Sequence, residues 1–178
     1  MSVKEQKGKS LKHGLLPPKE AEALPWDKMC VDLIGPYKIK RKGTDDLVLK
    51  AVTMIDPATG WFEIHQYEDK RAISVANVVE QEWFCRYPWP SQVITDRGSE
   101  FIGQEFKDMI KRDYGVVKKV ITTRNPQANA VVERIHQVLA NMVRTFELED
   151  KYLDADDPWK VILSAVAFAI RSTIHTTT

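Results

Sequence analysis

Three carboxylates stand where they could hold divalent cations together. Asp32 interrupts one apolar segment, Asp96 closely follows another, and Glu133 directly follows the pair Val131-Val132. In each of these settings a folded scaffold can hold a side chain still. Two divalent cations about 3.5–4 Å apart can activate a nucleophile and stabilise a leaving oxygen in phosphoryl transfer. The three acids therefore predict a metal-dependent phosphoryl-transfer site.

The segments that contain these acids resemble the catalytic core of retroviral and gypsy-type LTR-retrotransposon integrases. The resemblance rests on the order of the acids, on the segment Thr95–Phe101 (TDRGSEF) and on the segment Asn125–Arg134 (NPQANAVVER). It extends from about Trp26 to the C-terminus. It implies DNA integration by a polynucleotidyl transferase, an enzyme that trims the 3′ ends of element DNA and joins them to target DNA.

The resemblance also implies the chemistry of the site. Asp32 and Asp96 would be ligands of both metal ions, and Glu133 would complete one of the two ion sites. Mg²⁺ is the expected ion, with Mn²⁺ as a substitute, because oxygen ligands and substrate phosphates suit hard cations. Water would be the nucleophile in trimming and a DNA hydroxyl in joining, so no side-chain nucleophile is required. The expected partners are DNA and further copies of the core, and the expected location is intracellular, in the nucleus.

Apolar periodicity and turn residues predict an α/β chain that begins with antiparallel strands. The predicted elements are strands at Met29–Pro36, Leu47–Ile55 and Trp61–Tyr67, a helix at Ile73–Tyr87, a strand at Val93-Ile94, a helix at Gln104–Arg112, a strand at Val116–Ile121, and helices at Ala128–Leu148 and Pro158–Ile174. The resemblance implies that they form a ribonuclease-H-like fold, a mixed five-stranded sheet flanked by helices. Asp32 would then lie on the central strand beside the end of the strand that delivers Asp96.

Glu133 would approach the site from the long predicted helix. It lies about 200° round that helix from the core-facing Val131, at about 100° per residue. It therefore lies outside the core-facing side of the predicted helix and can face a metal site. Asn129, His136 and Gln137 lie close to it in the helix and would support the site. His136 could instead contact DNA or be a surface histidine.

Residues 1–25 predict a linker, because they are rich in lysine, contain Pro17-Pro18 and lack a periodic apolar pattern. Residues 26–178 would form the integrase core. We expect a core cut from a longer polyprotein or a degenerate element fragment, because the family's zinc domain and C-terminal DNA-binding domain are not recognisable. The core also departs from the family pattern: 36 residues separate Asp96 from Glu133, one more than usual, and Ala130 replaces a glycine.

The formal net charge of +1 does not by itself indicate nucleic-acid binding. Basic residues nevertheless gather in mid-chain, while acids concentrate in Glu147–Asp150 and Asp154–Asp157. A near-neutral total can therefore include a basic face for DNA phosphates. The predicted phosphate-contacting residues are Lys111, Arg112, Lys118, Lys119, Arg124, Arg134 and Arg144.

Single residues have simpler alternatives. Asp32 could pair with a basic group, since an unpaired buried charge is unfavourable, and Glu133 alone could be a solvated helix residue. Asp56 precedes Pro57 and is assigned to turn formation. Glu100 could act electrostatically on Asp96, but an exposed helix cap is the expectation for this residue.

The basic run Lys38–Lys42 is expected to be a solvated loop, with nuclear import or DNA contact as alternatives. Cys30 and Cys85 are expected to be buried, reduced thiols. No apolar run reaches the roughly 18 residues of a membrane span, and the polar start Met1–Glu5 is not a secretory signal. We therefore expect no membrane partner.

Two other functions remain open. One is a metal-dependent nuclease of the same fold that has no joining step. The other is a catalytically silent nucleic-acid-binding or assembly module derived from a retroelement. A strand-joining assay distinguishes both from an integrase.

Overall fold

The computed structural model describes residues 24–39, 45–69, 71–120, 137–138, 141 and 158–172. The strands are β1 (Lys28–Ile39), β2 (Leu47–Ile55), β3 (Phe62–Gln66), β4 (Gln92–Thr95) and β5 (Val117–Val120). They form a sheet of five strands in the order β3-β2-β1-β4-β5. β2 is antiparallel to both β1 and β3, while β4 is parallel to both β1 and β5. The mixed five-stranded sheet is therefore confirmed, with β1 at its centre.

Helical segments connect and flank these strands. They are α1 (Ala72–Val79) with its π-helical continuation η1 (Glu80–Phe84), α2 (Ser99–Ile102), α3 (Gln104–Asp108) with its π-helical continuation η2 (Met109–Asp113), and α5 (Pro158–Ser172). None of the described helices is long and apolar enough to cross a membrane.

β1 is longer than the sequence predicted. The prediction ended this strand at Gly35-Pro36, but β1 continues through that pair. Its pairing with β2 shifts register between Ile34 and Tyr37. The Gly-Pro pair therefore occupies an irregularity of the strand, where a residue without an N–H group is tolerated. Gly35 has φ +97°, and a Cβ there would lie 2.5 Å from the carbonyl oxygen of Leu49.

The other predicted elements that lie within the described residues occur, some with different ends. β2 has the predicted bounds, and the predicted helix at 73–87 occurs as α1 and η1. The predicted helix at 104–112 corresponds to α3 and η2, but the sequence missed the short α2 before it. Lys38 is an exposed strand residue rather than part of a loop, and residues 40–44 lie outside the described part of the chain. So do residues 1–23 and most of the predicted helix at 128–148, in which residues 137, 138 and 141 are helical.

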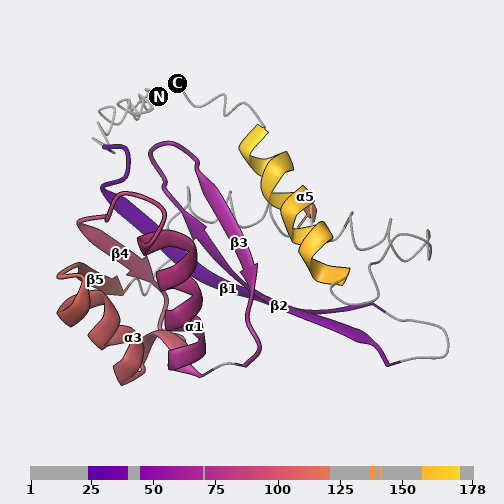
Figure 1. Ribbon diagram of the computed structural model, residues 1–178, viewed down its shortest axis with the longest axis horizontal. Helices are drawn as coiled ribbons and strands as arrows, with labels where there is room; N and C mark the ends of the chain where they lie inside the picture. Colours follow the sequence, from indigo (N-terminus) through magenta and orange to yellow (C-terminus); the bar gives the residue numbers. More distant parts are fainter. Residues whose placement is uncertain are drawn as a thin grey trace, which may run out of the picture.

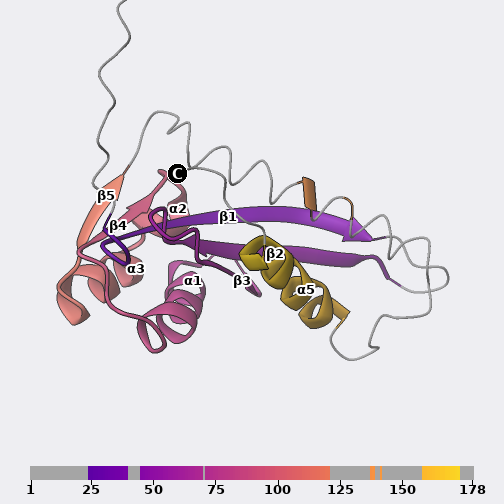
Figure 2. The same cartoon turned by 90° about the horizontal axis from the view of Figure 1, so that it is seen from above.

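Apolar side chains cover both faces of the sheet. Alternation along β1 directs Met29 and Val31 into the cluster with α1, η1 and α3, and directs Ile34 into the cluster with α5. Figures 1 and 2 show α1 and α3 grouped toward β4 and β5, and α5 at the other side of the molecule beside β2 and β3. Because Asp32 is in phase with Ile34, its side chain lies on the sheet face that α5 covers in part.

The assignment of Asp56 to a turn is confirmed. This buried carboxylate accepts hydrogen bonds from the N–H of Ala58 at 3.0 Å and from the hydroxyl of Thr59 at 2.6 Å. It also accepts the N–H of Trp26 at 3.0 Å. Asp56 therefore ties the segment before β1 to the turn between β2 and β3.

Candidate active site

Asp32 and Asp96 are neighbours on adjacent parallel strands. Cys30 of β1 is level with Ile94 of β4, and each aspartate lies two residues further along in the same direction. Because level residues of parallel strands point to the same face, this register directs both carboxylates to one face of the sheet. Asp96 is the first residue beyond the carboxyl end of β4. The fold therefore brings together two of the three predicted metal ligands.

Hydrogen bonds hold both carboxylates against their own backbone. Oδ1 of Asp32 accepts the N–H of Leu33 at 2.9 Å, and the Asp32 carbonyl accepts the hydroxyl of Thr53 at 3.2 Å. Oδ1 of Asp96 accepts the N–H of Gly98 at 2.8 Å. Asp32 is half-buried and Asp96 is exposed. A hydrated cation can therefore approach the pair from the side of Asp96.

Gly98 is confined between two carboxylates. A Cβ at this position would lie 2.8 Å from Oε2 of Glu100 and 3.1 Å from Oδ1 of Asp96. The φ of Gly98 is −54°, which any residue can adopt. Space, rather than backbone conformation, therefore requires glycine here. The short sequence Asp-x-Gly alone indicates little more than a turn. Here the absence of a side chain at Gly98 lets two carboxylates border the same space.

Glu100 is buried, and the expectation of an exposed helix cap is wrong. Its exposed fraction is 6%, and its Oε2 accepts a hydrogen bond from the Ser99 hydroxyl at 3.1 Å. Burial and the charge of Glu100 together raise the pKa of the Tyr67 phenol. The sequence did not reveal this because it missed α2, the single turn that directs Glu100 and Phe101 inward.

The third predicted ligand, Glu133, lies outside the described residues, as do Asn129 and His136. Gln137 is described, and it is helical and exposed. No group of three acidic, histidine or cysteine side chains within the described part of the chain is placed to hold a metal ion. The described part of the candidate site is therefore the pair Asp32 and Asp96, whose oxygen donors are of the type that Mg²⁺ prefers.

Lys118 and Lys119, two of the predicted phosphate contacts, point to opposite faces of the sheet because side chains alternate along β5. Lys119 is level with Ile94 of β4, so it lies on the same face of the sheet as Asp32, while Lys118 points to the opposite face. Lys119 is also exposed. Of these two lysines, Lys119 is therefore the one on the face of the candidate site.

Lys118 is engaged inside the protein. Its ammonium group donates a hydrogen bond to the carbonyl oxygen of Phe101 and lies 5.7 Å from the centre of the Phe106 ring. Burial and the charge of Lys107 lower the pKa of Lys118, while Asp96 opposes that change. A phosphate contact by Lys118 would require its ammonium group to leave these partners.

The two basic residues of η2 differ in their pairing. Lys111 is exposed. Arg112 is exposed as well but forms ion pairs with Asp113 at 2.9 Å and with Asp108 at 3.5 Å. The remaining predicted phosphate contacts, Arg124, Arg134 and Arg144, lie outside the described residues.

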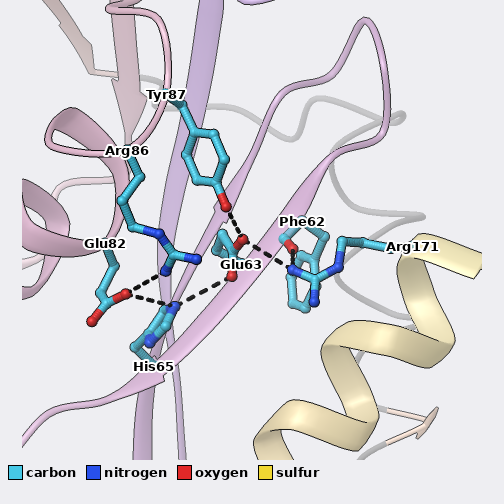
Figure 3. Close-up of polar contacts among 7 residues, drawn as sticks. All are labelled: Phe62, Glu63, His65, Glu82, Arg86, Tyr87 and Arg171. Carbon is cyan, nitrogen blue, oxygen red and sulfur yellow. Dashed lines mark hydrogen bonds and ion pairs between the residues drawn. The ribbon is translucent and has the colours of Figure 1, made fainter.

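A second polar cluster, which the sequence did not indicate, surrounds Glu63 on the edge strand β3 (Figure 3). Glu63 is 4% exposed. Its carboxylate accepts hydrogen bonds from the Tyr87 hydroxyl and, at 2.9 Å, from the Arg171 guanidinium, and it lies 3.3 Å from Nε2 of His65. Burial acts to raise the pKa of Glu63, but the hydrogen bonds from His65 and Tyr87 and the charge of Arg171 lower it to about 2.

This cluster borders a cavity of about 530 Å³ between β3, the α1–η1 helix and α5. The ionisable lining residues are Glu63, His65, Glu82, Arg86, Lys160 and Arg171. Arg171 also donates to the carbonyl oxygen of Phe62 at 3.2 Å, which satisfies a backbone group of an edge strand. The available sequence signal was Glu63 itself, an acid placed in a strand between apolar residues.

The two cysteines differ from their expectation in burial. Both are free thiols, but Cys30 is half-buried and Cys85 is exposed. Burial, with the charges of Asp56 and Asp32, raises the pKa of Cys30 to about 11. The expectation of two buried thiols is therefore wrong for Cys85.

The amino-acid sequence of this chain is similar to part of a retroelement polyprotein. Over 149 residues, or 83% of the chain, the sequence is 28% identical to the retrovirus-related Pol polyprotein from transposon 412 of Drosophila melanogaster. The chain spans 11% of the length of that relative. No family model matches the chain.

Solved structures with the same fold are integrase cores. The HTLV-2 integrase catalytic core domain, in complex with magnesium and in a dimeric form, matches with a TM-score of 0.57 and 16% identity over 87% of this chain and 90% of that chain. The catalytic core domain of BIV integrase matches with a TM-score of 0.54 and 16% identity over 86% of each chain. The chain therefore has the ribonuclease-H-like fold of integrase catalytic cores, and its resemblance to them is confirmed.

Proposed function

We propose that this chain is the catalytic core of an integrase, a metal-dependent polynucleotidyl transferase that trims the 3′ ends of element DNA and joins them to target DNA. The observation that carries the proposal is the register of β1 and β4, which makes Asp32 and Asp96 neighbours on the fold of integrase cores. The similarity to a retrovirus-related Pol polyprotein supports an origin in a retroelement. Joining to chromosomal DNA would take place in the nucleus.

Asp32 and Asp96 would hold two Mg²⁺ ions, with Glu133 as a further ligand and Mn²⁺ as a substitute ion. Two carboxylates directed to one face of the sheet offer the oxygen donors that such ions prefer, and the similar HTLV-2 core is in complex with magnesium. Bound there, the ions would supply activation of the attacking oxygen and stabilisation of the leaving oxygen.

The chain's own residues fix the geometry of this site. The N–H groups of Leu33 and Gly98 each donate to an oxygen of the neighbouring aspartate, and strand pairing sets the separation of the two backbones. Lys119 on the same face would contact a DNA phosphate and hold the duplex against the acids. The other proposed phosphate contacts are Lys111, Arg112, Arg124, Arg134 and Arg144, with Asn129, His136 and Gln137 supporting Glu133. Lys118 would join them only on leaving the Phe101 carbonyl.

The core would also bind a second copy of itself, through α5. Val161 and Phe168 are 51% and 70% exposed, and seven residues of helix place them on the same side, two turns apart. Exposed large apolar side chains gathered on one helix face are typical of an interaction surface. The dimeric form of the similar HTLV-2 core supports a second copy as the occupant.

Substitution of the three acids tests the proposed reaction. Asp32→Asn, Asp96→Asn and Glu133→Gln should each reduce joining chemistry to background, because ligands of one site act as a unit. A branched DNA that mimics the joined product is a suitable substrate, since its resolution in Mg²⁺ needs no knowledge of the element ends. Glu105→Gln and Asp113→Asn, which remove exposed acids outside the site, are the matched controls.

The outcomes separate the alternative functions. Hydrolysis of DNA without strand transfer by the parent chain would favour a nuclease, and DNA binding without either reaction would favour a silent binding module. Full activity of Glu133→Gln would remove Glu133 from the site and leave the pair Asp32 and Asp96 with a different third ligand.

A further inference from the structure

We propose that Glu100 is a positioning residue of this metal site, which fixes Asp96 through Gly98 and strengthens cation binding with its buried charge. The inference rests on the proposed function and deepens it, because it adds a residue outside the three predicted ligands. Glu100 is not assigned as a ligand of the ions.

The first support is the small space beside Gly98, which both carboxylates border. Oε2 of Glu100 and Oδ1 of Asp96 lie 2.8 and 3.1 Å from the position that a Cβ of Gly98 would occupy. Asp96 also accepts the Gly98 N–H at 2.8 Å. A displacement of Gly98 therefore changes the aim of the Asp96 side chain, and Glu100 limits that displacement from the other side.

The second support is the anchoring of α2, the turn that begins after Gly98. The Gly98 carbonyl accepts the N–H groups of Phe101 at 3.0 Å and Ile102 at 3.1 Å. Glu100 and Phe101 are both buried, and the Phe101 carbonyl accepts the ammonium group of Lys118 on β5. The turn that contains Glu100 is therefore held to the sheet, and it transmits that rigidity to Gly98.

The third support is electrostatic. Two carboxylates directed at one point repel each other when both are ionised, and a divalent cation nearby relieves the repulsion. Glu100 is 6% exposed, so water screens its charge less than it screens the charge of the exposed Asp96. A buried negative charge beside a ligand therefore raises the affinity of the site for a cation, without contact between Glu100 and the ion.

Glu100→Gln tests this role, because glutamine keeps the size of the side chain and an oxygen acceptor for Ser99 but removes the charge. The Mg²⁺ concentration that gives half of the maximal rate on the branched substrate should rise about tenfold. The rate at saturating Mg²⁺ should stay within about twofold of the parent rate, because the three ligands are unchanged. The increase of the melting temperature with Mg²⁺, measured on the same proteins without DNA, should show the same shift in midpoint.

Two further variants keep the test decisive. Glu105→Gln removes an exposed acid from the adjacent α3 and should leave the Mg²⁺ midpoint unchanged. Glu100→Asp keeps the charge and should restore a midpoint close to that of the parent, even if the shorter side chain lowers the melting temperature.

The possible results distinguish this inference from the proposed function. If the parent responds to Mg²⁺ and Glu100→Gln has the same midpoint, or if its maximal rate falls at an unchanged midpoint, the positioning role is overturned and the integrase proposal stands. If Mg²⁺ neither stabilises the parent nor supports its reaction, both are overturned. A midpoint shift shared by Glu105→Gln would assign the effect to net charge and would also overturn the role of Glu100.

Discussion

Gly98 shows how little space the candidate site leaves for a side chain. In Gly98→Ala the added methyl group would displace Glu100 or Asp96, whose oxygens lie 2.8 and 3.1 Å from the Cβ position. We expect the rate on branched DNA to fall by about tenfold to a hundredfold, since small displacements of reacting groups have effects of that size. Unfolding free energy should change by less than about 1 kcal/mol, because alanine accepts a φ of −54°.

Gly115 is the control, because its backbone conformation rather than its surroundings favours glycine. Its φ is +67°, and among the described residues no heavy atom beyond its own chain neighbours lies within 4 Å of its Cβ position. Gly115→Ala should therefore lower the unfolding free energy by roughly 1 kcal/mol through backbone strain, with an unchanged rate. Urea unfolding and the branched-DNA assay measure the two quantities. An unchanged rate in Gly98→Ala would show that the crowding around Gly98 does not matter for the reaction.

At the scale of the element, two adjacent lysines of β5 should have different roles: Lys119 in DNA binding and Lys118 in stability. Lys119→Ala should weaken duplex binding and reduce the slope of log K against log salt by about 0.9, the value for one phosphate contact. Lys118→Ala should leave that slope unchanged, because the ammonium group of the parent Lys118 is engaged with the Phe101 carbonyl and the Phe106 ring rather than with a phosphate. Loss of these contacts should instead lower the unfolding free energy by roughly 1 kcal/mol. Binding titrations over a range of salt concentrations distinguish the two, and the reversed result would place DNA on the opposite face of β5.

The contact between β3 and α5 should make stability depend on pH through Glu63. Its pKa is lowered from 4.5 to about 2 in the folded chain, so the stabilisation is complete above pH 4.5. It declines as the pH falls, since the unfolded chain takes up the proton first, and it is lost as the pH passes through about 2. Glu63→Gln should therefore lower the unfolding free energy near neutral pH by roughly 2 kcal/mol.

Urea unfolding of the parent and Glu63→Gln at a series of pH values measures this dependence. The difference between the two proteins should be constant above pH 4.5 and should shrink below it. Asp108→Asn, which removes a more exposed partner of Arg112, is the control and should have a smaller effect. A difference that persists unchanged into acid would show that Glu63 acts through packing rather than through its charge.

At the scale of the whole molecule, self-association should depend on the exposed face of α5. Phe168→Glu places a charge in the proposed contact, so it should convert a dimer to a monomer in sedimentation equilibrium. The unfolding free energy of the monomer should change little, because Phe168 is 70% exposed. Glu105→Lys, a charge change on the exposed side of α3, should leave the association unchanged. A parent chain that stays monomeric, or a dimeric Phe168→Glu, would contradict the proposed contact surface.

The sequence by itself determined an α/β chain with an antiparallel start, and its resemblance to integrase cores predicted the ribonuclease-H-like fold and a metal site. Asp32 and Asp96 were recognisable because an acid within or directly after an apolar strand is unusual, and Asp56 was recognisable as a turn residue from the proline beside it. Strands, helices and turns follow from short-range preferences, which are written in neighbouring residues. For this reason β2 has its predicted bounds, whereas β1 does not, since its irregularity at Gly35-Pro36 depends on the pairing with β2.

Only the tertiary structure decided which side chains meet. The pairing of β1 with β4 aligned Asp32 with Asp96, and a missed turn of helix buried Glu100 beside the second of these acids. The contact between Glu63 and Arg171 joins residues 108 positions apart. Register, burial and such contacts arise from packing between segments that are distant along the chain, and a local pattern does not contain that information.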